Sequence, residues 1–211
     1  MDFDVLRKIY RLLYQQPTIR TVVGTDGSVV SHTIVSNLIC GLEQGNSEGC
    51  YNFYIEKYHD IGNIRCIILD FDGVNAKSDV MEASTLLEFN KIMHVVVDST
   101  NKGYHLYIIL PEILNMMLFK DKNLNNKVFT NLVINLVGDY ESLDKANYGL
   151  FSRIRQIGSV HPKSNKVVSI IYAYTPFMDF DTFRVKADYY NSTNDYFNRA
   201  LHNSVKFLSY I

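Results

Sequence analysis

An apolar run that ends in two carboxylates one residue apart most constrains what this chain can fold into. The run covers residues 64–73 and reads Ile-Arg-Cys-Ile-Ile-Leu-Asp-Phe-Asp-Gly. It predicts the end of a buried strand, whose period of two places Asp70 and Asp72 on one face and Phe71 on the other. Two carboxylates that point the same way repel each other unless a cation lies between them, so the pair is a candidate site for Mg²⁺ or Mn²⁺. The alternative is a strand end that runs into a turn, where Asp and Gly are common.

Length and composition favour one domain, or two closely joined lobes, with a substantial core. The chain has 211 residues, of which 47% are hydrophobic. Cys40, Cys50 and Cys66 form no CxxC pair, so neither a disulfide framework nor a zinc knuckle is predicted. The sequence shows no signal-peptide pattern and no apolar stretch of about 18 residues, so we expect a cytoplasmic, intracellular protein without a membrane partner. Because the net charge is −1, nucleic-acid binding would require a local basic patch.

Hydrophobic spacing predicts helices and strands before the carboxylate run. Residues 3–13 repeat apolar side chains at helical spacing. Residues 21–30 fit a hairpin around an Asp-Gly turn, although residues 31–42 also fit a helix, and both interpretations remain open. Residues 51–58 read as an aromatic-rich strand. We expect this strand to pair with the carboxylate strand, because only a short turn separates the two.

The second half of the chain continues this mixture. Ser78 is expected to cap a helix. Residues 94–98 and 104–110 read as two strands joined by a loop, and the interrupted pattern over residues 111–137 indicates two helices. The closing segment, about residues 179–211, has a helical pattern, and a second Asp-Phe-Asp at its start reads as the beginning of that helix.

The loop between the strands at 94–98 and 104–110 offers several phosphate-binding groups. It carries the hydroxyl of Ser99, the amine of Lys102, a glycine, and then the imidazole of His105. A turn of this kind can present N–H groups and short donors to an oxyanion. The alternative is an ordinary hairpin loop with a surface lysine and a half-buried histidine.

A third stretch is reserved for positive charge. Between Lys145 and Met178 the sequence has no Asp or Glu. The same stretch carries basic side chains at Lys145, Arg153, Arg155, His161, Lys163 and Lys166. This segregation predicts a polyanionic partner held near the carboxylates. A solvated basic face fits less well, because the two arginines flank an apolar isoleucine in a segment that reads as a partly buried strand.

Two of these stretches resemble motifs of the archaeo-eukaryotic primase superfamily, which contains primases and primase-polymerases. Residues 68–73 resemble its first motif, a hydrophobic strand that ends in Asp-x-Asp. Residues 99–105, Ser-Thr-Asn-Lys-Gly-Tyr-His, are similar to its second motif, commonly Ser-Gly-x-x-Gly-x-His, with Thr100 where glycine is usual.

A third element resembles the same family, in the family's order. Asp144 resembles the third acidic position, and residues 153–163 resemble the Arg-x-Pro-Gly-Ser-x-His-x-Lys stretch of archaeal small primase subunits, with Ile157 in place of proline. The spacing between them needs a gap of about one residue, which leaves Asp139 as a second candidate for the third carboxylate. The resemblance extends over residues 51–174.

The resemblance implies an α+β primase-polymerase fold over residues 1–211 as a single catalytic domain. In that fold an N-terminal α/β unit and a C-terminal unit resembling an RNA-recognition module enclose the active-site cleft. It also implies an enzyme, a nucleotidyltransferase that acts as a DNA primase or DNA-directed polymerase on a single-stranded DNA template and primer. The zinc motif of many cellular relatives is absent, which suggests a minimal core that serves the replication of a plasmid, virus or mobile element, such as an archaeal one. A helicase or accessory primase subunit would be encoded elsewhere.

The resemblance also implies a role for each site residue. Asp70, Asp72 and Asp144 would hold two divalent ions, Mg²⁺ or Mn²⁺, that bind the incoming triphosphate and activate the primer 3′-hydroxyl for in-line attack on the α-phosphorus. The remaining residues would contact the nucleoside triphosphate, with one of the arginines near phosphates of nucleotide or template: Ser99, Lys102, His105, Arg153, Arg155, Ser159, His161 and Lys163.

Two other functions compete with this interpretation. Residues 68–74 also resemble the nucleophile motif of haloacid dehalogenase-like phosphatases, in which Asp70 would be phosphorylated and Asp72 would be the general acid. Asp139 and Asp144 would then resemble the metal motif of that superfamily. Against it, about 60 residues precede the strand, and the basic stretch goes unexplained. A non-catalytic relative that only binds nucleic acid is the other alternative, which the three carboxylate candidates disfavour.

Overall fold

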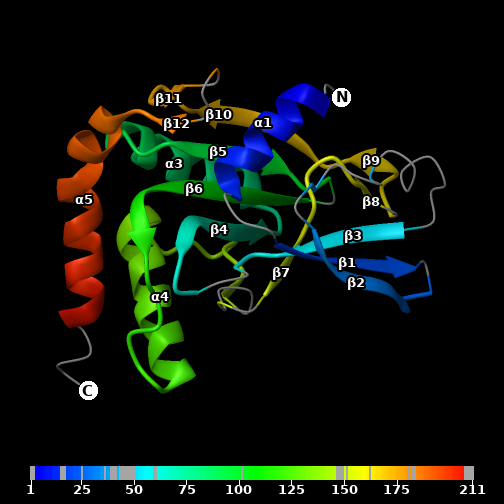
Figure 1. Ribbon diagram of the computed structural model, residues 1–211, viewed down its shortest axis with the longest axis horizontal. Coiled ribbons are helices and arrows are strands. Elements are labelled where there is room, and N and C mark those ends of the chain that lie inside the picture. The colour runs from blue at the N-terminus through cyan, green and yellow to red at the C-terminus, as the bar shows by residue number, and fades with distance from the viewer. Residues whose placement is uncertain are drawn as a thin grey trace.

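The computed structural model describes residues 3–14, 18–24, 26–35, 37–38, 42, 51–58, 61–100, 102–145, 150, 152–161, 163–179, 181 and 184–206. Its elements mix helices with two antiparallel four-stranded sheets (Figure 1). In chain order they are α1 (Phe3–Leu13), β1 (Thr18–Gly24), β2 (Val29–Val35), β3 (Tyr51–Glu56), β4 (Ile64–Asp72), α3 (Ala76–Phe89), β5 (His94–Asp98), β6 (Gly103–Leu114), α4 (Lys122–Val137), β7 (Arg153–Arg155), β8 (Val160–His161), β9 (Lys166–Val167), β10 (Ser169–Tyr174), β11 (Met178–Asp179), β12 (Arg184–Val185) and α5 (Ala187–Lys206).

The predicted carboxylate strand is β4, at one edge of a sheet with the strand order β10-β5-β6-β4. β4 runs antiparallel to β6, and their register sets Asp70 opposite His105 and Asp72 opposite Gly103. β5 pairs with the other side of β6, as the two predicted strands and their loop require. The sheet therefore brings the end of the carboxylate strand next to the loop at residues 99–103.

Alternation along β4 separates its apolar side chains from its carboxylates. Ile67, Leu69 and Phe71 are buried in one core cluster with residues of α3, α4 and α5, whereas Ile68 belongs to a second cluster with residues of α1 and β3. Each fully buried side chain of this size contributes about 1.5–3 kcal/mol relative to exposure. The period of two then turns Asp70 to the second face, toward the other sheet.

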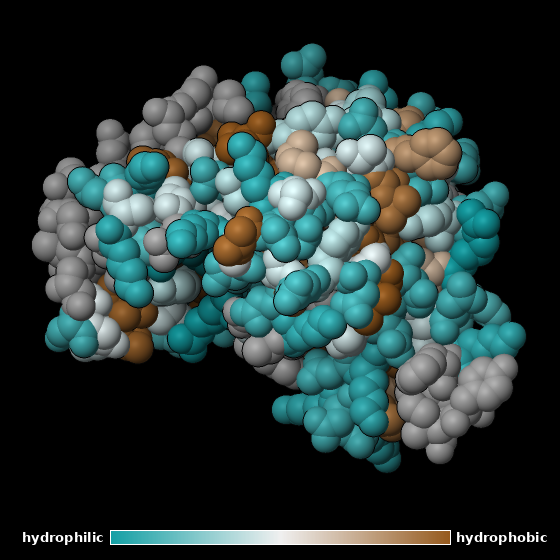
Figure 2. Space-filling model, turned by 180° about the vertical axis from the view of Figure 1, so that it is seen from behind, coloured by the Kyte–Doolittle hydropathy of each residue, from teal (hydrophilic) through white to brown (hydrophobic). Residues whose placement is uncertain are grey.

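The second sheet has the strand order β2-β1-β3-β7. Its hairpin of β1 and β2 confirms a strand over residues 29–35, so the helical alternative is wrong for residues 31–35. Of the rest of that alternative, residues 36 and 39–41 lie outside the described residues. The turn is closed by the Asp26 carboxylate, which accepts a hydrogen bond from the N–H of Ser28 at 2.9 Å. Seen from behind, the molecule is mainly hydrophilic with scattered apolar side chains, and its outline is hollowed between the side of this sheet and the side of α4 and α5 (Figure 2).

The expected pairing of residues 51–58 with the carboxylate strand is wrong. β3 pairs with β1 and β7, so the chain changes sheets between β3 and β4. Two other groups lie at the outer edge of β4. The Tyr58 hydroxyl accepts a hydrogen bond from the N–H of Ile68 at 2.8 Å, and Leu143 forms an isolated antiparallel bridge with Phe71. A short turn thus does not decide which strands become neighbours.

Three other predicted elements differ from the structure. Residues 111–114 extend β6, and one helix, α4, replaces the two expected over residues 111–137. Its polar start is stabilised by Asp121, whose carboxylate accepts from the N–H of Asn123 at 2.8 Å. Ser78 does not cap α3 but lies in its first turn, where its hydroxyl donates to a backbone carbonyl.

The second Asp-Phe-Asp does not start the last helix. Asp179 pairs with Arg184 in the short hairpin of β11 and β12, and α5 begins only at Ala187. Among the described residues, no helix is long and apolar enough to cross a membrane.

Candidate active site

A cavity of about 220 Å³ lies where the ends of β4 and β6 meet β3, β7 and β8. Four stretches of the sequence supply its walls. Three of them are the ones that resemble the primase motifs, and the fourth is β3. The described lining residues are Tyr54, Asp70, Asp72, Ser99, Gly103, His105, Arg153, Ile154, Arg155 and His161. The structure therefore brings both carboxylates of the strand together with the predicted hydroxyl, imidazoles and guanidinium groups.

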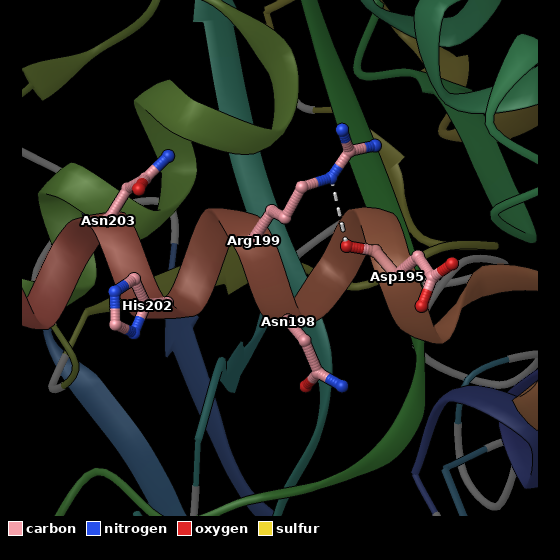
Figure 3. Close-up of a pocket in the computed structure, with 5 residues that line it drawn as sticks. All are labelled: Asp195, Asn198, Arg199, His202 and Asn203. Atoms are coloured by element: carbon pink, nitrogen blue, oxygen red, sulfur yellow. Dashed lines mark hydrogen bonds between the residues drawn. The ribbon is translucent and has the colours of Figure 1, made fainter.

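A second hollow, of about 490 Å³, has a different character. Its described lining residues all lie on α5: Asp195, Asn198, Arg199, His202 and Asn203 (Figure 3). The Arg199 Nε donates to the backbone carbonyl of Asp195 at 3.2 Å. None of the residues singled out in the sequence lies there.

The third carboxylate candidate follows the segment at the edge of β4. The N–H of Asp144 donates to the carbonyl of Asp70 at 2.9 Å, and the N–H of Asp72 donates to the carbonyl of Ser142 at 2.7 Å. These two bonds fix the backbone of Asp144 beside that of Asp70. Asp139 instead forms an ion pair with Lys145 at 2.8 Å, where both side chains are more than half exposed.

The environment of Asp70 carries an excess of negative charge. Burial raises the pKa of this carboxyl to about 6, the Lys57 ammonium lowers it, and the carboxylates of Asp144 and Asp72 raise it further. Because two acidic neighbours act against one cation, a further cation near Asp70 would be stabilised.

The side chains of the cavity supply only part of the ligands that a hard divalent ion needs. Within the described residues, no three His, Cys, Asp or Glu side chains are grouped closely enough to hold a metal alone. Magnesium, however, is commonly bound by one or two carboxylates, waters and substrate phosphates rather than by an all-protein cage. Asp70 and Asp72, in one cavity, supply such a pair of carboxylates.

The loop before β6 has two non-glycine residues with positive φ angles. Thr100 and Lys102 have φ angles of +78° and +68°, in the left-handed region. A β-branched residue there costs about 1–3 kcal/mol. Two contacts offset this strain, because the Thr100 N–H donates to the Asp98 carboxylate at 2.6 Å and its hydroxyl lies 2.8 Å from the Ser164 hydroxyl. These contacts therefore hold Thr100 in a backbone conformation that glycine adopts more readily.

Gly103 allows this loop to close against the end of β4. A Cβ atom at this position would lie 2.6 Å from the Ser99 hydroxyl and 3.7 Å from a carboxylate oxygen of Asp72. The N–H of Ser99 also donates to the carbonyl of Gly103 at 3.0 Å. The absence of a side chain thus lets the Ser99 hydroxyl lie beside the carboxylates.

His105 is a buried, neutral imidazole in the cavity wall. Burial, with the charges of Lys57 and Arg155, lowers its pKa to about 3. Its Nε2 lies 3.8 Å from Asp70 Oδ1. Because the imidazole is neutral at neutral pH, this contact is not an ion pair. Among the described residues, its Nδ1 has no hydrogen-bond partner. A buried nitrogen without a partner in a cavity wall is a candidate ligand contact.

Arg155 and Tyr54 form a second unit of the wall. The Arg155 Nη2 donates to the Tyr54 hydroxyl at 2.8 Å, and the guanidinium lies over the Tyr54 ring at 4.8 Å from its centroid. This contact orients the guanidinium while leaving it at the cavity. The sequence interpretation missed Tyr54, for which the only signal was its place in an aromatic-rich strand.

Several predicted residues lie apart from the cavity walls. Asp144, Lys102, Ser159 and Lys163 are described residues that do not line the cavity. The Ser159 side chain is buried and donates to the carbonyl of Gln156 at 2.6 Å, which indicates a structural role in the turn after β7. Lys102 and Lys163 are exposed. The backbone N–H of Lys163 donates to Nδ1 of His161 at 3.2 Å, which connects it to the wall.

Sequence reasoning also missed a buried lysine whose charge neighbours are the carboxylates of Asp70 and Asp144. Lys57 is 4% exposed and directly follows β3. Burial lowers its pKa to about 8, while the charges of Asp70 and Asp144 raise it. The one available signal was its spacing from Phe53 and Ile55, the inward-facing positions of the strand.

The fold and this cavity define the class of protein: an α+β chain with antiparallel sheets, in the architecture of primase-polymerases. The AEP domain of the primase-polymerase of cyanophage S-2L is similar over 86% of this chain and 96% of that one, with a TM-score of 0.55 and 16% identity. Primase RepB' is similar over 96% of this chain and 64% of that one, with a TM-score of 0.52 and 11% identity.

The polymerase domain of Mycobacterium tuberculosis ligase D, solved in complex with DNA, is similar over 96% of this chain and 88% of that one, with a TM-score of 0.52 and 10% identity. No family model and no curated protein matches the chain. At these identities the likeness shows the fold. The resemblance to the archaeo-eukaryotic primase superfamily that the motifs predict is confirmed at that level.

Proposed function

We propose that the protein is a nucleotidyltransferase that joins nucleotides on a single-stranded DNA template, as a primase or DNA polymerase. One observation carries the proposal: on a primase-polymerase fold, Asp70 and Asp72 share a cavity with His105 and Arg155, contributed by three separate segments. Carboxylates for a divalent ion and donors for phosphates are the groups that nucleotide transfer requires.

The chain's own residues divide this work. Asp70 and Asp72, with Asp144 beside them, would hold two Mg²⁺ or Mn²⁺ ions. When bound, these ions would neutralise the triphosphate and activate the primer 3′-hydroxyl for in-line attack on the α-phosphorus. Ser99 and the neutral imidazole of His105 each have a hydrogen to donate to a phosphate oxygen.

The basic residues would hold the polyanions. Arg155, already oriented by Tyr54, and His161 would contact the triphosphate from the opposite wall. Arg153, Lys102 and Lys163 are exposed near the cavity, where long flexible or planar cations suit phosphates of the nucleotide or of the template.

The wider context belongs to the same proposal. A template and primer would bind in a cleft between an N-terminal α/β unit and a C-terminal unit resembling an RNA-recognition module. One neighbour was solved with DNA, which supports a DNA substrate. Another is a phage protein, which supports a role in the replication of a plasmid, virus or mobile element. The proposal places this role in the cytoplasm, with any helicase or accessory subunit supplied by another chain. The phosphatase alternative is not favoured, because the neighbours described above are primases and polymerases.

A template-directed incorporation assay tests the proposed function. Primed and unprimed single-stranded templates are incubated with ribonucleotides or deoxynucleotides and with Mg²⁺ or Mn²⁺. We expect incorporation by the parent protein and none by Asp70→Asn or Asp72→Asn, since each change keeps the shape but removes a metal-binding charge. Retained polymerisation in either variant would reject the assignment. Phosphomonoester hydrolysis with a trapped aspartyl-phosphate on Asp70 would support the phosphatase instead.

A further inference from the structure

Lys57 is a buried lysine that directly follows β3, the strand that supplies Tyr54 to the cavity wall. It is 4% exposed and follows Phe53 and Ile55 at the same spacing of two, and those residues belong to the core cluster that contains Ile68 of β4. Its backbone N–H donates to the carbonyl of Ser152 at 3.0 Å, which fixes it between β3 and β7. An ammonium group is rarely buried to this extent unless it is paired.

Hydrogen bonds connect the segment of Lys57 to the strand that carries the carboxylates. Its neighbour Tyr58 is bound to the N–H of Ile68, two residues before Asp70 on the same face of β4. At the same edge of β4, the N–H of Asp144 donates to the carbonyl of Asp70. Both carboxylates act on the Lys57 charge, and Lys57 in turn acts on Asp70.

We propose that Lys57 is a positioning residue for the carboxylates, whose fixed positive charge holds Asp70 and Asp144 together before a metal ion binds. The inference rests on the proposed function, because that function makes these carboxylates the ligands of a divalent metal ion. Three carboxylates without a cation repel one another, and Lys57 offsets part of that repulsion inside the protein. A divalent ion held by these carboxylates would supply the rest of the neutralisation.

Thermal unfolding of the full chain at pH 7, with and without Mn²⁺, tests the proposal. Lys57→Met keeps the length of the side chain and removes the charge. Without metal we expect its Tm to fall by about 4–8 °C, because a partly buried carboxylate loses its partner. Saturating Mn²⁺ should reduce this gap at least by half, and Mn²⁺ titration followed by electron paramagnetic resonance should show several-fold tighter binding, because the repelling ammonium is gone.

Two controls separate this role from ordinary packing. Lys145→Met removes an exposed lysine that pairs with Asp139, and its Tm difference from the parent should not depend on Mn²⁺. In the Asp70→Asn background without metal, Lys57→Met should lower the Tm by less than it does in the parent, because one of the two charges that it balances is absent. That background also keeps the test available if the single variant does not fold.

The outcomes are distinct from those of the proposed function. A Tm that rises in Lys57→Met without metal, or a gap that Mn²⁺ and Asp70→Asn both leave unchanged, overturns the role of Lys57. If Mn²⁺ shifts the Tm of neither the parent nor Lys57→Met, the metal part of the proposed function fails, while the metal-free comparison with Asp70→Asn still decides the Lys57 inference.

Discussion

Asp70 and His105 lie opposite each other on neighbouring strands, and burial drives both side chains toward their uncharged forms. The pKa of Asp70 is raised to about 6, and that of His105 is lowered to about 3. At neutral pH the acid is therefore mostly ionised and the imidazole is neutral. The pair can accept a cation on one side and donate a hydrogen bond to a phosphate on the other, without an internal ion pair that would have to break first.

Asp144 and Asp139, the two candidates for the third carboxylate, differ in their contacts. We expect Asp144→Asn to reduce nucleotide incorporation by about 100-fold or more, because it removes a charge fixed beside Asp70. Asp139→Asn should change incorporation by less than about twofold, since this residue forms an exposed ion pair with Lys145. Steady-state incorporation rates of the two matched variants, with their folding checked by circular dichroism, measure the difference. The reverse ranking would make Asp139 the third carboxylate.

At the scale of elements, a hydrogen bond joins the loop between β5 and β6 to the turn between β8 and β9. Both segments carry residues that we propose contact phosphate. The hydroxyls of Thr100 and Ser164 lie 2.8 Å apart, across 64 residues of sequence. One belongs to the loop between β5 and β6 and the other to the turn between β8 and β9. The contact therefore couples the Ser99 side of the cavity to the His161 side.

A double-mutant cycle measures this coupling. Thr100→Val keeps the side-chain shape and loses the hydroxyl, and Ser164→Ala removes the partner. Each should lower the free energy of unfolding by about 0.5–1.5 kcal/mol, and the double variant should lose little more than one of them. The KM for the nucleoside triphosphate should rise in both single variants, and Thr100→Ser is the matched control that retains the bond. Fully additive losses would mean that the two hydroxyls act separately.

Local elements were predictable from the sequence, because hydrophobic period and turn residues are local signals. The strand β4, the hairpin of β5 and β6 and the loop between them lie where the pattern placed them. The partner of β3 was not predictable, since strand pairing is set by contacts between distant segments. The polar start of α4 read as an interruption because its cap, Asp121, and its buried Asn125 look like loop residues until their bonds are seen.

The residues of the candidate site also fall into those that the sequence predicted and those that it did not. Asp70, Asp72, Ser99 and His105 could be proposed from motifs whose residues are close in sequence. Lys57 and Tyr54 could not, because their importance depends on β3 lying across the cavity from β4. A lysine at a strand end is usually exposed, and only the packing of the two sheets shows that this one is buried.

At the scale of the whole molecule, stability should fall as the pH is lowered from 7 to 5. Burial lowers the pKa values of His94, His105 and His161, so the unfolded chain binds protons below about pH 6.5 that the folded protein does not. Their contribution is therefore intact above pH 6.5 and is lost as the pH decreases. Asp70 acts in the opposite direction, because its raised pKa favours the folded state as it gains a proton, by about 1 kcal/mol over this range.

Among the three histidines, His105 is expected to contribute most to the pH dependence of the free energy of unfolding, and one substitution can isolate its contribution. With a folded pKa of about 3 against an unfolded value of about 6.5, it accounts for about 2 kcal/mol of the loss at pH 5. The decrease in the free energy of unfolding between pH 7 and 5, measured by urea titration without divalent ions, should thus be about 2 kcal/mol smaller in His105→Gln than in the parent. His202→Gln, a change at an exposed position on α5, should leave the decrease unchanged. An equal decrease in all three proteins would mean that His105 takes up its proton in the folded protein as readily as in the unfolded chain.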